Sequence, residues 1–164
     1  MNNKVKNRMR KLAGIISERV EIHKDVLGQK YVAFYFSPGE VKPFLTKVRN
    51  LHTPQEYAEY VRNQKTRDRG KHHITIISPG EFGKLESQGI KITNADLPVG
   101  APKLMGLGMA TKKENMAYYI IVDFPEGNIF RESLGLPPKD FHITLAYKGN
   151  DVHEVPKGIE TKID

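Results

Sequence analysis

Two short stretches of the chain carry one pattern: a histidine, an aliphatic residue, a threonine and a second aliphatic residue. The pattern reads HITI at residues 73–76 and HITL at residues 142–145. Side chains alternate between the two faces of a β-strand, so on strands the histidine and threonine of each copy would share one face while the aliphatic residues face the core. Each copy would then present an imidazole beside a hydroxyl.

Two imidazoles and two hydroxyls that converge on one cleft suit an in-line displacement at phosphorus. A neutral imidazole accepts a proton from the attacking water or hydroxyl, and a protonated one gives a proton to the departing oxygen. Histidine holds both forms near neutral pH, since its ordinary pKa is about 6.5. We therefore predict that His73 and His142 are the acid-base pair and that Thr75 and Thr144 bind the phosphate. The near-symmetry of the two copies leaves open which histidine is the base.

Further residues are candidates for substrate binding. The same alternation places Lys71, before the first motif, and Lys148, after the second, on the catalytic face, where cations would offset developing negative charge. Tyrosine rings could stack on a base. The tyrosines considered are Tyr31, Tyr35, Tyr118, Tyr119 and Tyr147, and Tyr147, two residues after the second motif, is the one predicted to bind substrate.

Other polar residues near the motifs favour structural roles. His72 alternates to the face opposite His73, so we interpret it as a structural or surface residue. Asp151 and His153 could contribute to a metal site, but no HExxH pattern accompanies them, and a turn or a contact at the rim of the site is favoured. Gly106 and Gly108 form a GxG without a following helix signature and indicate a bulge or a close strand approach. We predict no metal and no cofactor.

The motifs must be positioned by an alternation of strands and helices. We expect a strand at residues 30–36, ended by residues 37–39, and a helix from near Pro54 with Thr53 as N-cap and Glu56 three residues after it. Residues 72–78 are typical of a strand stopped by a Pro-Gly pair.

The second half of the chain continues the pattern. Residues 81–87 are a weak helix and residues 89–102 irregular. Residues 103–111 and 116–124 predict two antiparallel strands, residues 128–136 a short helix, and residues 141–148 the last strand. The order β-α-β-α-β-β-α-β predicts an α+β domain of two similar halves.

Length and composition exclude several classes. A chain of 164 residues with 38% hydrophobic and 27% charged residues fits one globular domain, and no apolar run is long enough to cross a bilayer. The absence of cysteine excludes disulfides and thiol catalysis, and we expect a reducing, cytoplasmic setting and a monomer.

The net charge of +7 favours anionic partners and is concentrated at the N-terminus, where residues 1–24 carry seven Lys or Arg against two Glu. Val5, Met9, Leu12, Ile16 and Val20 are spaced as on an amphipathic helix. We therefore divide the chain into a basic N-terminal helical arm at residues 1–25 and one domain at residues 26–164. The arm either packs on the body or contacts a polyanion.

The paired motifs resemble those of the two-histidine (2H) phosphoesterases, whose signature is two His-x-Thr/Ser motifs, each followed by an apolar residue. The segment LPPKDFHITLAYKGNDVH at residues 136–153 is further similar to the Swiss Army Knife, RNA-repair-like branch of that superfamily. The resemblance covers residues 30 to about 155. It implies a bilobal α+β fold with concave antiparallel sheets and metal-independent opening or cleavage of phosphodiesters.

The resemblance leaves three functions to distinguish. The favoured one is hydrolysis of a nucleotide 2′,3′-cyclic phosphate, at an RNA end or on a small nucleotide, as in RNA processing and repair. A second enzymatic alternative is hydrolysis of cyclic oligonucleotide signals, as in some viral members of the family. The alternative of another class is a non-catalytic module that binds RNA or a nucleotide, with the basic arm supplying affinity.

Overall fold

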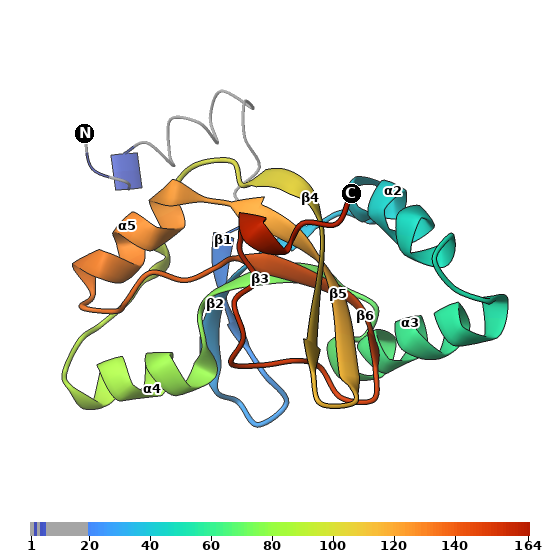
Figure 1. Cartoon of the computed structure of the whole chain (residues 1–164). Coiled ribbons are helices and arrows are strands. Elements are labelled where there is room, and N and C mark those ends of the chain that lie inside the picture. Colours follow the sequence, from blue (N-terminus) through green and yellow to red (C-terminus); the bar gives the residue numbers. More distant parts are fainter. Residues whose placement is uncertain (1, 3, 6–19) are drawn as a thin grey trace. The chain divides into compact units, whose positions relative to one another are not determined.

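The computed structural model describes residues 2, 4–5 and 20–164, which form two three-stranded sheets and four helices (Figure 1). This confirms the predicted α+β class. The elements in chain order are β1 (Val20–Lys24), β2 (Lys30–Phe36), α2 (Pro38–Arg49), α3 (Pro54–Asp68), β3 (His72–Ile77), α4 (Pro79–Ser87), the 3₁₀ turn η1 (Asn94–Asp96), β4 (Lys103–Lys112), β5 (Asn115–Asp123), α5 (Pro125–Ser133), β6 (His142–Lys148) and the 3₁₀ turn η2 (Ile159–Thr161).

The chain divides into two compact units, each assembled from three segments. Unit 1 comprises the chain up to Phe34 together with Thr75–Ala101 and Phe124–Lys139. Unit 2 comprises Tyr35–Ile74, Pro102–Asp123 and Asp140–Asp164. The first sheet has the order β1-β2-β3 and the second, which lies within unit 2, the order β4-β5-β6.

Strand β1 corrects the prediction for the N-terminal arm. The helical arm was expected at residues 1–25, but Val20–Lys24 is a strand, antiparallel to β2, with Val20 opposite Phe34 and Lys24 opposite Lys30. The physical reason is that β2, as a hairpin partner, supplies backbone hydrogen bonds and covers the alternating residues of VEIHK. Within this stretch only Val20 belonged to the predicted helical spacing, so pairing with β2 stabilises the strand more than that spacing stabilises a helix. The rest of the predicted arm lies outside the described residues, apart from residues 2 and 4–5.

Three helices begin with the same local device. Helix α3 starts as predicted: Thr53 Oγ1 accepts a hydrogen bond from Glu56 N, and Glu56 Oε1 accepts one from Thr53 N. The tetrapeptide Ser-Pro-Gly-Glu occurs at residues 37–40 and 78–81, and in each copy the glutamate carboxylate accepts from the serine N–H at the start of α2 or α4. These are capping boxes with proline at the first helical position. Helix α2 was not predicted, because the Ser-Pro-Gly at its start also suits the end of the preceding strand.

In unit 1, helix α5 is tied to the start of α4 by a buried arginine. Arg131, only 3% exposed, donates through Nη1 and Nη2 to the two carboxylate oxygens of Glu81 at 2.9 and 2.8 Å. Its remaining donors reach the carbonyl oxygens of Ile76 and Pro137, both at 2.9 Å. The guanidinium is therefore paired and hydrogen-bonded, as burial of a charge requires.

In unit 2, antiparallel strands β4, β5 and β6 form the sheet that carries the second motif. One face of this sheet holds a cluster of buried side chains that includes Tyr119. The members are Ala110, Ala117, Tyr119, Ile121, Tyr147 and Val152. Helices α2 and α3 lie against β4 and β6. Tyr118, which alternates to the other face, contacts His52 in the connection between these helices, and the His52 ring also contacts Tyr60 of α3.

The two glycines of β4 give this face the room it needs, which confirms their predicted role. The register shifts between Leu104 and Gly106, which marks a β-bulge. A Cβ at Gly108 would lie 2.4 Å from Tyr119 Cε2, and one at Gly106 would lie 2.4 Å from Lys162 Cε. The glycines therefore let the Tyr119 ring and the C-terminal segment pack directly on the backbone of β4.

A membrane-spanning helix was not expected. Within residues 2, 4–5 and 20–164, none of the helices combines the length and the hydropathy needed to span a bilayer.

Candidate active site

The second motif histidine is held by its own backbone at the start of β6. His142 is half-buried, and its Nδ1 lies 2.9 Å from the carbonyl oxygen of Asp140. A carbonyl only accepts, so Nδ1 carries the proton and donates, which leaves Nε2 as the atom that can accept or release a proton. The ring also makes an edge contact with Tyr119 of β5, with 5.7 Å between ring centroids.

A β-bulge in β6 changes which side chains share the His142 face. Ile121 pairs with His142 and Tyr119 with Thr144, but Tyr118 then pairs with Ala146, so Leu145 is the extra residue. Directly opposed residues project from the same face, and the bulge reverses the alternation beyond it.

The reversal moves two of the predicted substrate-binding residues. Tyr147, opposite Ala117, joins the face of His142 and Thr144, while Lys148, opposite Met116, falls on the other face. The alternation argument for Lys148 therefore fails, although this lysine is exposed. Tyr147 is buried, its hydroxyl donates to the Asn63 carbonyl at 2.8 Å, and its ring lies 5.3 Å from the Arg67 guanidinium, so it packs α3 against β6.

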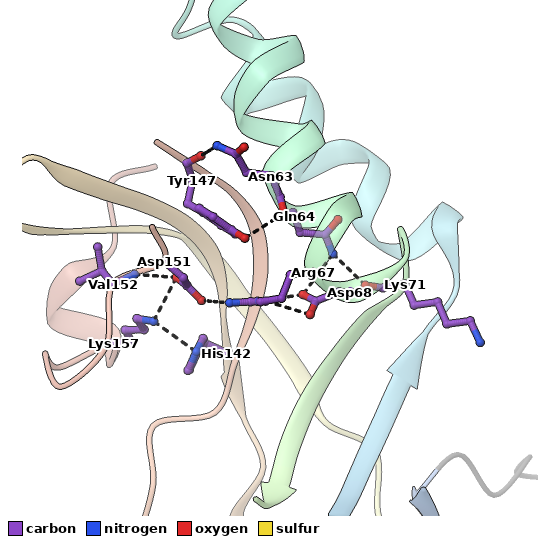
Figure 2. A network of polar contacts seen from close by, with 10 residues as sticks. All are labelled: Asn63, Gln64, Arg67, Asp68, Lys71, His142, Tyr147, Asp151, Val152 and Lys157. Carbon is purple, nitrogen blue, oxygen red and sulfur yellow. Dashed lines mark hydrogen bonds and ion pairs between the residues drawn. The ribbon is translucent and has the colours of Figure 1, made fainter. Parts of the chain in front are cut away.

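The first motif histidine has a tyrosine neighbour as well. His73 of β3 is half-buried, and its ring centroid lies 4.9 Å from that of Tyr35, a half-buried residue of β2. The exposed Lys71 places its Nζ 6.0 Å from the centroid of the Tyr35 ring. Figure 2 shows the Lys71 side chain directed away from His142. Lys71 thus belongs to the surroundings of Tyr35 and His73.

Three of the four motif residues belong to the same compact unit. His73, His142 and Thr144 are in unit 2, and the boundary between the units passes between Ile74 and Thr75. Thr144 is 8% exposed, whereas Thr75 is half-buried. His72 is also half-buried; burial lowers its pKa, and its Nε2 lacks a hydrogen-bond partner among the described residues.

A chain of charges that sequence reasoning missed leads from the exposed Arg67 to His142 (Figure 2). Lys157 Nζ lies 3.4 Å from His142 Nε2 and 3.9 Å from Asp151 Oδ1, and the second oxygen of Asp151 accepts from Arg67 Nη1. Arg67 in turn contacts Asp68 through Nε at 2.9 Å and Nη2 at 2.8 Å. The residues come from α3, from the loop after β6 and from the C-terminal segment, so no spacing in the sequence joins them.

The electrostatics of this chain follow from burial and pairing. The side chains of Lys157 and Asp151 are each 5% exposed. Burial lowers the pKa of Lys157, with Asp151 opposing this effect and Arg67 adding to it. Burial acts to raise the pKa of Asp151, but the hydrogen bond and charge of Arg67, with the charge of Lys157, outweigh it and the pKa lies below its ordinary value. Asp151 is therefore an anion fixed between two cations.

The pairing of Asp151 also bears on its suggested metal role. Its carboxylate oxygens face Arg67 and Lys157. Across the part of the chain that the structure describes, no group of three or more His, Asp or Glu side chains is placed to hold a metal ion. Asp151 is the centre of an ion-pair chain in the structure, and its turn or rim role stays a prediction.

Comparison with known proteins identifies the class. The family model described as Swiss Army Knife, 2H phosphoesterase domain matches residues 41–153, which is more than half of the chain and includes both His-x-Thr motifs. The chain belongs to this family, and it is a phosphoesterase hydrolase with an activity of the phosphodiesterase type. No curated protein and no solved structure matches the chain.

Proposed function

We propose that the chain hydrolyses a nucleotide 2′,3′-cyclic phosphate without a metal ion, with His73 and His142 as the acid-base pair. The observation that carries the proposal is the arrangement at His142. Its Nδ1–H donates to a backbone carbonyl, so Nε2 is the ring nitrogen that can accept or release a proton. The His142 ring is half-buried, and its Nε2 lies beside the Lys157 ammonium. A histidine that served only for packing would need neither feature.

The proposed reaction balances with these residues alone. A water oxygen bonds to phosphorus while one imidazole accepts the water proton. The bond from phosphorus to the ribose 2′ or 3′ oxygen breaks, and the protonated imidazole gives its proton to that oxygen. The product is a phosphomonoester, and the two histidines return to their starting forms by proton exchange with water. The hydroxyls of Thr75 and Thr144 are proposed to hydrogen-bond the non-bridging oxygens.

The tyrosine next to His73 favours a nucleotide over a simple diester. Of the five tyrosines considered, Tyr118, Tyr119 and Tyr147 are buried, and Tyr31 stacks on His23. Tyr35 is half-buried and lies beside His73, with Lys71 nearby. A base stacked on an accessible ring gains about 1–3 kcal/mol, largely independent of its identity. Tyr35 is therefore the proposed stacking residue, and the basic composition favours an anionic substrate.

The test is turnover of a substrate panel in the presence of EDTA. The panel holds 2′,3′-cyclic mononucleotides, an RNA ending in a cyclic phosphate, and cyclic dinucleotides. We expect cyclic-phosphate opening by the natural sequence and a loss of 10²–10⁴-fold in kcat for His73→Ala and for His142→Ala, the usual contribution of a general acid or base. His23→Gln, in β1 and outside both motifs, is the matched histidine control and is expected to keep full turnover.

Each other outcome selects an alternative. Turnover of cyclic dinucleotides alone would replace the proposed substrate by cyclic oligonucleotide signals. Activity abolished by EDTA and restored by a divalent ion would overturn the metal-free reaction. Binding without turnover on the whole panel would contradict the proposed reaction and favour a binding module. Circular dichroism of each variant distinguishes lost chemistry from lost folding.

A further inference from the structure

A lysine outside the family match contacts the reacting nitrogen of a motif histidine. Lys157 lies in the C-terminal segment, after residue 153, where the match to the family model ends. Its Nζ is 3.4 Å from His142 Nε2, and the same ammonium lies 5.4 Å from the centroid of the Tyr119 ring, which itself contacts His142. Lys157 and Tyr119 thus enclose the imidazole from the C-terminal segment and from β5.

The position of Lys157 is fixed by contacts at both ends of the residue. Its backbone N–H donates to Asp140 Oδ2 at 3.2 Å, and its ammonium lies 3.9 Å from Asp151 Oδ1. Asp151 is also paired with Arg67. The residues after Lys157 are held to the sheet as well, since Thr161 Oγ1 accepts from the Tyr119 hydroxyl at 2.7 Å. The ammonium is therefore an ordered charge.

The contact discriminates between the protonation states of His142. An ammonium has only donors, so it can approach Nε2 favourably only when that nitrogen offers a lone pair. With a proton on Nε2, two donors and two positive charges would face each other. At 3.4 Å the contact is long for a hydrogen bond, and its main effect is the electrostatic one, in which a nearby like charge disfavours the imidazolium.

We propose that Lys157 is a positioning residue that keeps His142 neutral, with its proton on Nδ1 and its Nε2 lone pair available, and so makes His142 the general base and His73 the general acid. This inference rests on the proposed function for the roles of the two histidines. The state of His142 itself is independent of any substrate.

Other ionisable groups also lie near His142 and Lys157. Asp140 lies two residues before it, Tyr119 faces it from β5, and three acidic groups and one basic group lie around Lys157 and Tyr119. These charges are Asp151 and Glu160 of the C-terminal part and Arg67 and Asp68 of α3. The Lys157 ammonium is the charge that lies 3.4 Å from Nε2 of the ring.

The test is a pH titration of the His142 ring by nitrogen NMR in the full chain without substrate. Long-range proton–nitrogen spectra distinguish the two neutral tautomers and the imidazolium, and His142→Ala identifies the signals. In Lys157→Met, which preserves length and burial, we expect the imidazolium to persist to a pH higher by about one unit. Where turnover is measured, the acidic limb of kcat/KM moves by the same amount, so activity lost near neutral pH returns as the pH rises.

Controls separate this role from a structural one. Lys157→Arg keeps the charge, so the midpoint of the His142 titration is expected to be the same as in the natural sequence. Lys112→Met removes a charge from an exposed pair with Glu154 and is expected to leave the midpoint unchanged. Should Lys157→Met fail to fold, Lys157→Gln gives the same readout.

Two results would overturn the inference: an unchanged midpoint in the folded Lys157 variants, or a natural chain with the proton on Nε2. If no cyclic phosphate in the panel is turned over while the midpoint of the His142 titration moves in Lys157→Met, the proposed function is wrong. The effect of Lys157 on the protonation state of His142 is then still supported.

Discussion

Replacing Glu81 by glutamine isolates one charge at the junction of α4 and α5. The carboxylate meets Arg131, which is 3% exposed and reaches both carboxylate oxygens within 2.9 Å. Glutamine keeps an oxygen that can accept from Ser78 N, so the start of α4 is preserved. The substitution therefore leaves a buried guanidinium without its counter-ion, for which the usual cost is about 3–5 kcal/mol.

The pKa of Glu81 gives a second estimate of the same contribution. Burial acts to raise this pKa, but hydrogen bonds from Arg131 and the Ser78 backbone outweigh burial and lower it from 4.5 to about 2. That difference corresponds to about 3 kcal/mol. Because the side chain is 27% exposed, solvent screening makes this an upper value, and we expect about 2–3 kcal/mol.

The sign of the pH dependence follows from the lowered pKa. A carboxylate with a folded-state pKa below its unfolded value stabilises fully above about pH 4.5, and this stabilisation is lost as the pH falls toward 2. The natural sequence and Glu81→Gln should therefore differ less in their free energy of unfolding at pH 3 than at pH 7, by about 2 kcal/mol.

Urea unfolding at several pH values measures this difference. The chain has no tryptophan, so far-ultraviolet circular dichroism is the suitable signal. Glu56→Gln is the matched control, because Glu56 occupies the same capping position in α3 but is 46% exposed. We expect it to cost less than 1 kcal/mol. A Glu81→Gln difference that stays constant from pH 7 to pH 3 would refute the ion-pair explanation, as would equal costs for the two variants.

Two further predictions concern unit 2. Gly108→Ala places a Cβ 2.4 Å from the Tyr119 ring, so we expect a loss of about 1–3 kcal/mol in urea unfolding and reduced kcat, whereas Gly39→Ala, in open space, should leave both nearly unchanged. Arg67→Met leaves the buried Asp151 with Lys157 as its remaining cation. We expect the free energy of unfolding to fall by about 3 kcal/mol at pH 7 and the pKa of Asp151 to rise from its lowered value. An Asp151 carboxyl whose NMR titration is unchanged in this variant would contradict the pairing.

Elements with strong local signals could be predicted from the sequence. The β4–β5 hairpin, the strands carrying the two motifs and the start of α3 at Thr53 were confirmed, because turn residues, alternation and capping boxes act within a few residues. The irregular stretch at residues 89–102 was also confirmed, apart from the short turn η1. Helix α2 was not predicted, because a Pro-Gly pair suits both a turn and a helix start. Strand β1 was not predicted, because VEIHK becomes a strand only beside β2.

The surroundings of the site depend on contacts that sequence patterns do not encode. The extra residue Leu145 in β6 reverses the alternation, which exchanges the faces expected for Tyr147 and Lys148. Lys157 follows no motif, and its position beside His142 depends on Asp151 and on the packing of the C-terminal segment. The four motif residues themselves remain a prediction, which the activity and NMR experiments above address.

The repeated Ser-Pro-Gly-Glu has a consequence for the order of folding events. Both copies form their first hydrogen bonds between residues three apart, so these corners can form early and at low entropic cost. Arg131 lies 50 residues beyond Glu81 and can reach it only after a long loop has closed. If the ion pair forms after the transition state, Glu81→Gln will accelerate unfolding by most of its free-energy cost and leave the folding rate nearly unchanged. The tetrapeptide would then start a helix early in both copies, and in the second copy its glutamate would also form an ion pair late in folding.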